Sequence, residues 1–139
     1  DDLRLWNSEK LGEDSRAFYK EWSKTGSTIK MHNIDIHVKV SRIGWRHIKN
    51  KKRNERVQLS KKLLPIAKKI LEHSSEIKPV LLKSNYQDTL WEFMTMHIGY
   101  RARINLEGEE RKVQVVLKRY INKSVDTEKW WFYSVHIVK

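Results

Sequence analysis

The sequence predicts an α+β protein in which N-terminal helices pack on an antiparallel sheet of about four to five strands. In the first half, apolar residues recur mainly at helical spacing; in the second half, they alternate with polar residues, as half-buried strands require. The alternation is clearest in the last twelve residues, EKWWFYSVHIVK. Helices followed by a run of strands are typical of this class. At 139 residues, the chain is long enough for one such domain with its own core.

The first half supplies the expected helices and one strand. Residues 1–26 favour a helical arm, and Gly26 is a suitable C-cap because glycine adopts the left-handed conformation of a helix end. Residues 28–40 alternate and indicate a half-buried strand. Ser41 can cap a short helix over residues 41–50, since its hydroxyl can accept from the first free backbone N–H groups.

The second half begins with the clearest helix and continues with strands. Residues 57–74 repeat apolar side chains at helical spacing, although Pro65 should break or kink the helix because it lacks a backbone N–H. Strands are expected at 77–83, 89–106, 111–121 and 128–139, separated by turns at 85–88 and 107–110 and by a loop that begins at 122. We expect residues 1–27 to be an arm or the end of an upstream linker, and residues 28–139 to be the functional domain.

Composition points to a partner with negative charge. The chain holds 29 lysines and arginines against 17 acidic residues, a net charge of +12, which favours nucleic acid, an anionic membrane surface or an acidic protein. It has no cysteine, so disulfides and cysteine-ligated metal sites are excluded. No apolar run is long enough to span a membrane. The chain opens with neither a signal peptide nor a methionine, and we therefore expect either a domain cut from a longer protein or a processed chain.

The densest positive charge follows the short helix. Six lysines and arginines fall between residues 46 and 56. This segment is either a solvated loop or a stretch that binds the phosphates of a nucleic acid. The RNA-binding residues that we predict are Arg46, Lys49, Lys51, Lys52, Arg53, Arg101, Arg103 and Tyr120.

Residues able to cleave RNA without a metal are spread over one helix and three strands. Such cleavage needs a base for the 2′-hydroxyl, an acid for the leaving 5′-oxygen and cations for the charge that develops on the phosphate. Histidine suits the first two roles because its pKa lies near neutrality. The polar pair Ser134 and His136 interrupts an apolar strand, which either reflects such a site or is satisfied by neighbouring strands. The catalytic candidates are His47, Lys118, Arg119, Ser134 and His136. The histidines show no metal-ligand spacing, so we expect no metal site and no cofactor.

Two short segments and the order of elements resemble the barnase/EndoU/colicin/RelE-like ribonuclease superfamily. The segments are Arg46-His47-Ile48, ahead of the basic stretch, and Ser134-Val135-His136 on the last strand. Within the superfamily, the chain is similar over roughly residues 28–139 to toxin domains at the C-termini of contact-dependent inhibition proteins and other polymorphic toxins. The resemblance implies a site between helix and sheet, with His47 opposite Lys118, Arg119 and either Ser134 or His136.

The resemblance also implies a biological setting. A toxin domain of this kind would be secreted or delivered from a bacterial cell surface as part of a larger protein, and would act in the cytoplasm of the target cell. Its substrate would be tRNA, cut by 2′-hydroxyl attack to a 2′,3′-cyclic phosphate. An acidic cognate immunity protein would neutralise it. We expect a monomeric toxin domain.

A non-catalytic RNA- or DNA-binding module is the alternative, because positive charge and exposed aromatic residues suffice for binding. A membrane-surface domain is disfavoured, since the sequence shows no basic amphipathic helix of strong moment. The first two hypotheses differ in one observable: a ribonuclease produces RNA fragments, whereas a binding module leaves RNA intact.

Overall fold

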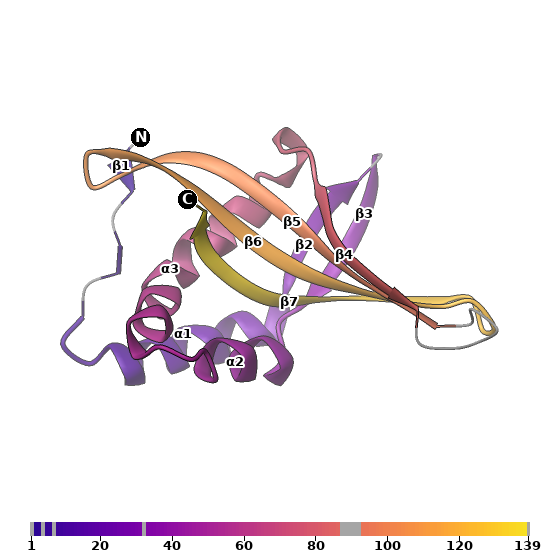
Figure 1. Cartoon of the computed structure of the whole chain (residues 1–139), viewed down its shortest axis with the longest axis horizontal. Helices are drawn as coiled ribbons and strands as arrows, with labels where there is room; N and C mark the ends of the chain where they lie inside the picture. Colours follow the sequence, from indigo (N-terminus) through magenta and orange to yellow (C-terminus); the bar gives the residue numbers. More distant parts are fainter. Residues whose placement is uncertain (1, 4, 7, 32, 87–92, 139) are drawn as a thin grey trace.

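The computed structural model describes residues 2–3, 5–6, 8–31, 33–86 and 93–138. Over these ranges the chain has the predicted α+β class, with three α-helices packed against a curled, mixed sheet (Figure 1). The helices are α1 (Leu11–Thr25), α2 (Arg42–Lys49) and α3 (Asn54–Glu72), and a 3₁₀ turn (Ser74–Glu76) follows α3. The strands are β1 (Asp2–Leu3), β2 (Ser27–Met31), β3 (Ile34–Lys39), β4 (Val80–Tyr86), β5 (Phe93–Leu106), β6 (Glu109–Asn122) and β7 (Thr127–Val138).

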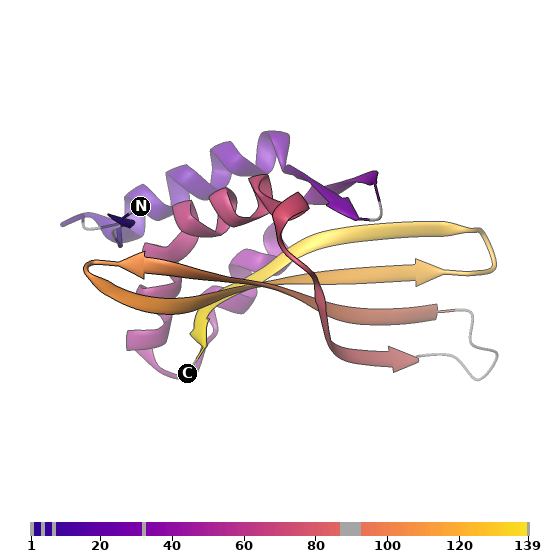
Figure 2. The same cartoon turned by 90° about the horizontal axis from the view of Figure 1, so that it is seen from above.

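A long antiparallel meander of β5, β6 and β7 forms the middle of the sheet (Figure 2). The strand order is β1-β5-β6-β7-β3-β2, and β4 pairs with β5 as well. β3 runs parallel to β7, with Val38 opposite Trp130 and Lys39 opposite Trp131. The described sheet is therefore larger than the expected four to five strands, and it is mixed, because β1 and the β2–β3 hairpin extend it through parallel pairings.

The single strand predicted over residues 28–40 is a hairpin of two strands, β2 and β3. The chain reverses near Asn33, whose φ of 64° lies in the left-handed region that asparagine tolerates better than most residues. Residue 32 lies outside the described part of the chain. Ile34 and Val38 share one face of β3, but Ile34 lies next to the turn and is exposed, whereas Val38 is fully buried.

Helices occur in the three predicted regions, but α1 covers only Leu11–Thr25 of the expected arm, and α3 begins at Asn54, earlier than expected. Gly26 caps α1 with a φ of 64°, and its N–H donates to the carbonyl of Trp22 at 2.7 Å. The side chain of Ser41 accepts from the backbone N–H of Ile43 at 3.4 Å and caps α2. Helix α3 runs through Pro65 without the predicted break. An interior proline costs about 3 kcal/mol, and here the burial of apolar side chains on both sides of it outweighs that cost. These buried residues are Leu63, Leu64, Ile66 and Ala67.

Strands β4, β6 and β7 are shifted from their predicted positions, and β6 is longer than predicted. β4 begins at Val80 and includes two residues of the turn expected at 85–88, while residues 87–92 lie outside the described ranges. The β5–β6 turn is shorter than expected, because it consists of Glu107 and Gly108 alone. Both have positive φ, 53° and 89°, as a two-residue hairpin turn of this type requires.

The core lies between the helices and one face of the meander. Tyr19 and Trp22 of α1 pack on Phe132 of β7, with ring centroids 6.2 and 4.9 Å apart. The same cluster includes Leu63 and Leu71 of α3, both fully buried. Helix α1 therefore shares one core with the sheet. We call the sheet face turned away from α1 and α3 the far face.

Candidate functional site

Helix α2 lies close against β7 because residue 44 is glycine. A Cβ at Gly44 would stand 2.6 Å from the carbonyl oxygen of Phe132 and 2.6 Å from the hydroxyl of Tyr19. That hydroxyl donates a hydrogen bond to the carbonyl of Ser41, which ties the start of α2 to α1. The close approach places His47, one turn further along α2, beside β7.

Tyr133 is an extra residue in β7. Opposite β6, Ser134 pairs with Val116 and Phe132 pairs with Leu117, so the register skips Tyr133 and forms a β-bulge. The strict alternation predicted for this strand is therefore wrong, because the bulge changes the phase of the residues before it. The core face carries Trp130, Phe132, Val135 and Ile137, and the far face carries Trp131, Ser134 and His136.

The bulge brings two imidazoles and a lysine onto one aromatic ring. The His47 ring stacks on the Tyr133 ring, with centroids 3.9 Å apart and planes 26° apart. His97 of β5 meets the same ring edge-on, at 5.0 Å between centroids. The ammonium of Lys118, which lies opposite His97 on β6, is 5.6 Å from the centre of that ring. Tyr133 thus holds His47 and His97 near the same cation.

A third imidazole, that of His136, is oriented by a hydrogen-bonded chain along the far face. Arg101, Gln114 and His136 lie opposite one another on β5, β6 and β7. The Nε of Arg101 donates to Oε1 of Gln114 at 2.5 Å, so the Gln114 amide nitrogen faces Nε2 of His136 at 3.1 Å. An amide nitrogen only donates, so Nε2 accepts and the neutral imidazole carries its proton on Nδ1. His136 can therefore offer that N–H to an anion.

Lys51 reaches the cluster from the link between α2 and α3. Its ammonium donates to Oγ of Ser60 at 2.7 Å, and Oγ of Ser60 donates to the carbonyl of Val135 at 2.9 Å. Ser60 is 1% exposed, so this chain of hydrogen bonds ties Lys51 firmly to β7. The positive charge of Lys51 acts on both His47 and His136. We call His47, His97, His136, Lys51, Lys118 and Arg101 the histidine cluster.

The cluster favours neutral imidazoles as long as no anion is bound. Burial is the largest cause of a lowered pKa for each of the three histidines. Neighbouring charge lowers the pKa further: that of Lys51 for His47 and His136, and that of Lys118 for His97. An anion among these groups would offset the repulsion, so its binding would be coupled to proton uptake. One ring nitrogen of the cluster has no partner among the described residues: Nδ1 of His97 is buried and makes no hydrogen bond there.

The structure brings together three of the five predicted catalytic residues, namely His47, Lys118 and His136. Ser134 is buried on the same far face, opposite Val116. Arg119 lies on the opposite face of β6, where its Nε contacts Glu128 at 2.6 Å and its guanidinium lies over the Trp130 ring. Neighbouring residues of a strand point to opposite faces, so Arg119 does not join Lys118 in the cluster.

The predicted RNA-binding residues are divided among several places. Lys51 and Arg101 belong to the cluster, and Tyr120 lies on the far face, two residues beyond Lys118. Arg46, Lys52 and Arg53 are exposed on α2 and the following link, close in sequence to His47 and Lys51. Lys49 lines a hollow between helices together with Trp45 and Lys61.

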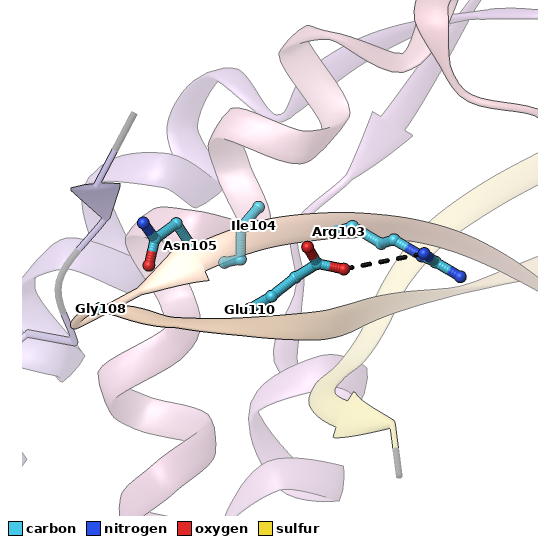
Figure 3. Close-up of a pocket in the computed structure, with 5 residues that line it drawn as sticks. All are labelled: Arg103, Ile104, Asn105, Gly108 and Glu110. Atoms are coloured by element: carbon cyan, nitrogen blue, oxygen red, sulfur yellow. Dashed lines mark ion pairs between the residues drawn. The ribbon is translucent and has the colours of Figure 1, made fainter.

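Arg103 lies two residues beyond Arg101 on β5, about 7 Å further from His97, in a hollow beside the β5–β6 turn. Figure 3 shows this hollow, where Arg103 forms an ion pair with Glu110 at 3.7 Å. Arg103 lies six residues from His97, which corresponds to about 20 Å along a strand. The other residues lining the hollow are Ile104, Asn105 and Gly108.

Sequence reasoning missed His97, Tyr133 and Gln114 as members of the site. A signal for His97 was present, because it alternates with Arg101 and Arg103 on one face of the strand. The strand register that sets His97 opposite Lys118 was needed to place it. No sequence pattern marked Tyr133, since the bulge that exposes it to His47 interrupts an otherwise regular alternation.

The fold and the cluster define an α+β protein with a cationic, histidine-rich site on a sheet face. Among the described residues, no group of three or more histidine, aspartate or glutamate side chains could hold a metal ion. No helix in the described part of the chain is both long and apolar enough to cross a membrane. A scan against protein-family models and searches of curated proteins and of solved structures found no match to this chain.

Proposed function

We propose that the protein is a metal-independent endoribonuclease whose active site is the histidine cluster. The observation that supports this most strongly is the convergence of His47 and His97 on the Tyr133 ring beside Lys118. Two imidazoles near one cation provide a base, an acid and a charge stabiliser within the space of one phosphodiester. A binding surface alone needs only the positive charge, whereas here two titratable imidazoles also meet on one ring.

The chemistry follows from the properties of these groups. A neutral imidazole takes the 2′-hydroxyl proton, and the 2′-oxygen attacks phosphorus. The second imidazole, protonated as the substrate's negative charge offsets its neighbours, gives its proton to the 5′-oxygen as the P–O5′ bond breaks. The products are a 2′,3′-cyclic phosphate and a 5′-hydroxyl. His47 and His97 share the roles of base and acid in this proposal.

The remaining groups stabilise charge. Lys118 and Lys51 approach the imidazoles from β6 and from the α2–α3 link, and the N–H of His136 is directed by Gln114. Preformed donors of this kind stabilise the extra negative charge of the pentacoordinate phosphorus without reorganisation. DNA lacks the attacking 2′-hydroxyl and would be bound without being cut.

The resemblance to toxin domains extends the proposal to tRNA as substrate and to an acidic immunity protein as partner. The net charge of +12 and the cationic cluster support both, since opposite charge speeds association. The domain would be delivered from a producing bacterium into the cytoplasm of a target cell. Expression of the domain alone should then arrest growth, and co-expression of the acidic partner should restore it. A domain harmless in the cytosol without a partner would contradict the toxin proposal.

The direct test is incubation of the protein with total tRNA in excess EDTA. We expect discrete fragments from the wild-type protein and a reduction of at least about 10²-fold in His47→Ala and His97→Ala, the usual effect of losing an acid or base. His73→Ala is the matched control, because His73 is an exposed histidine at the end of α3, and it should cleave like the wild type. RNA that is shifted in a gel but stays intact would favour the binding module instead.

A further inference from the structure

An aromatic pair lies next to the histidine cluster on the far face. Tyr120 of β6 and Trp131 of β7 are half-buried, and their ring centroids are 6.2 Å apart at an interplanar angle of 49°. Lys118 lies opposite Trp131 and Lys129 lies opposite Tyr120, so all four side chains share the far face. Trp131 lies directly across from Lys118, and Tyr120 is about 7 Å further along β6.

This part of the sheet is accessible from the side of the far face. The ends of β6 and β7 nearest their connecting turn project beyond the helices in both views (Figures 1 and 2). Tyr120 is two residues from the end of β6. Lys129 is exposed beside it. A chain bound at the cluster would therefore continue across the aromatic pair without meeting a helix.

The combination of aromatic rings and lysines suits one chemical class. Bases of a single strand stack on aromatic side chains whatever their sequence, while lysines contact the adjacent phosphates. Paired bases are already stacked within a helix, and their faces are not available. Duplex RNA would contact the lysines but gain nothing from Tyr120 and Trp131.

We propose that Tyr120, Trp131 and Lys129 form a subsite that stacks unpaired bases of RNA beside the scissile phosphate and so limits the enzyme to single-stranded segments. This inference rests on the proposed ribonuclease function. It adds the class of substrate: a loop, a bulge or an unpaired end. The aromatic pair fixes the bases, and Lys118 connects the subsite to the histidine cluster.

The experiment measures binding apart from cleavage, with a fluorescently labelled all-deoxy 12-mer that cannot be cut. Trp131→Ala and Tyr120→Ala should each weaken binding of the single strand by about tenfold, the effect of losing one stacked base. Binding of the same sequence as a duplex should change less than twofold. Trp131→Phe, which keeps an aromatic ring, should restore most of the affinity and shows that folding is intact. Lys129→Ala should also weaken binding of the single strand, and Lys69→Ala, which removes an exposed charge on α3, is its control and should bind like the wild type.

The cleavage assay completes the test by comparing two RNA substrates. In one, the target sequence forms the loop of a hairpin, and in the other, the same sequence is annealed to its complement as a duplex. The wild type should cut the loop far faster than the duplex, and Trp131→Ala should reduce that preference. Unchanged single-strand binding in Trp131→Ala, or equal losses for single strand and duplex, would overturn the subsite. If the wild type leaves RNA intact while Trp131→Ala still loses single-strand binding, the subsite stands and the ribonuclease proposal fails.

Discussion

The substitution Gly44→Ala tests how the site is assembled. Two effects of opposite sign compete at this position. Alanine is the better helix former by about 1 kcal/mol. Its methyl group, however, would stand 2.6 Å from the carbonyl oxygen of Phe132, 2.6 Å from the hydroxyl of Tyr19 and 2.9 Å from Cδ2 of Phe132. Contacts this short require α2 or β7 to move.

Neither contacting group can give way cheaply. The carbonyl belongs to the backbone of a central strand, and the Tyr19 hydroxyl is hydrogen-bonded to the carbonyl of Ser41. Overpacking of a core costs about 1–3 kcal/mol or more, and fixed neighbours place this site at the upper end. After subtraction of the helix-propensity gain, we expect the free energy of unfolding to fall by about 2 kcal/mol.

Urea unfolding, with wild type and Gly44→Ala compared at equal m-values, measures this change. Gly12→Ala in α1 is the matched control, because a Cβ there meets no atom within 4 Å, and it should be neutral or slightly stabilising. In the folded fraction of Gly44→Ala, the ring protons of His47 should lose the shielding that stacking on Tyr133 provides. If Gly44→Ala has wild-type stability and an unchanged His47 signal, the close packing of α2 on β7 is not what positions His47.

Three further predictions concern charge. The pH profile of kcat/KM reports the free enzyme, in which burial and Lys118 hold the pKa values of the imidazoles below their usual range, so its optimum should lie below about 6.5. In Lys118→Ala both limbs of the profile should shift to higher pH, and an unshifted profile would contradict the electrostatic coupling between Lys118 and the imidazoles. Ser60→Ala should lower the free energy of unfolding by about 1–3 kcal/mol, and it should raise the pKa of His136 in an NMR titration because Lys51 loses its hydrogen bond to Ser60. If the substitution only left a cavity, the pKa of His136 would not change. Binding of uncleavable RNA should weaken steeply with salt. Replacement of the exposed Lys52 and Arg53 by alanine should reduce the slope of log Kd against log salt by about 2 and leave thermal stability nearly unchanged, and a slope equal to that of the wild type would show that these residues do not contact RNA.

Local patterns in the sequence were sufficient to predict the class of fold and the residues at which several helices begin or end. The Gly26 and Ser41 caps depend on the chemistry of single residues, and both occur as predicted. The hairpin at Asn33 was missed because the apolar alternation continues on both sides of the turn. Pro65 was misjudged because tertiary burial on both sides of it, which no local pattern shows, outweighs the lost N–H.

The candidate site depended on information that spacing alone does not contain. Sequence reasoning selected His47, Lys118 and His136, which do converge. Arg119 was grouped with Lys118 as a neighbour in sequence, although adjacent strand residues point to opposite faces. His97 enters the site through strand register, and a β-bulge brings Tyr133 into it. Both are properties of strand pairing.

The most direct test of the proposed function is cleavage of a DNA oligonucleotide that contains a single ribonucleotide in an unpaired segment, in the presence of EDTA. The attacking group is then present at one position only, so the product identifies the chemistry. The histidine cluster predicts one cut, immediately 3′ of the ribonucleotide, leaving a 2′,3′-cyclic phosphate and a 5′-hydroxyl, and little product with His47→Ala or His97→Ala. Cleavage at deoxynucleotides, or an uncut oligonucleotide under conditions in which the protein binds it, would contradict the proposal.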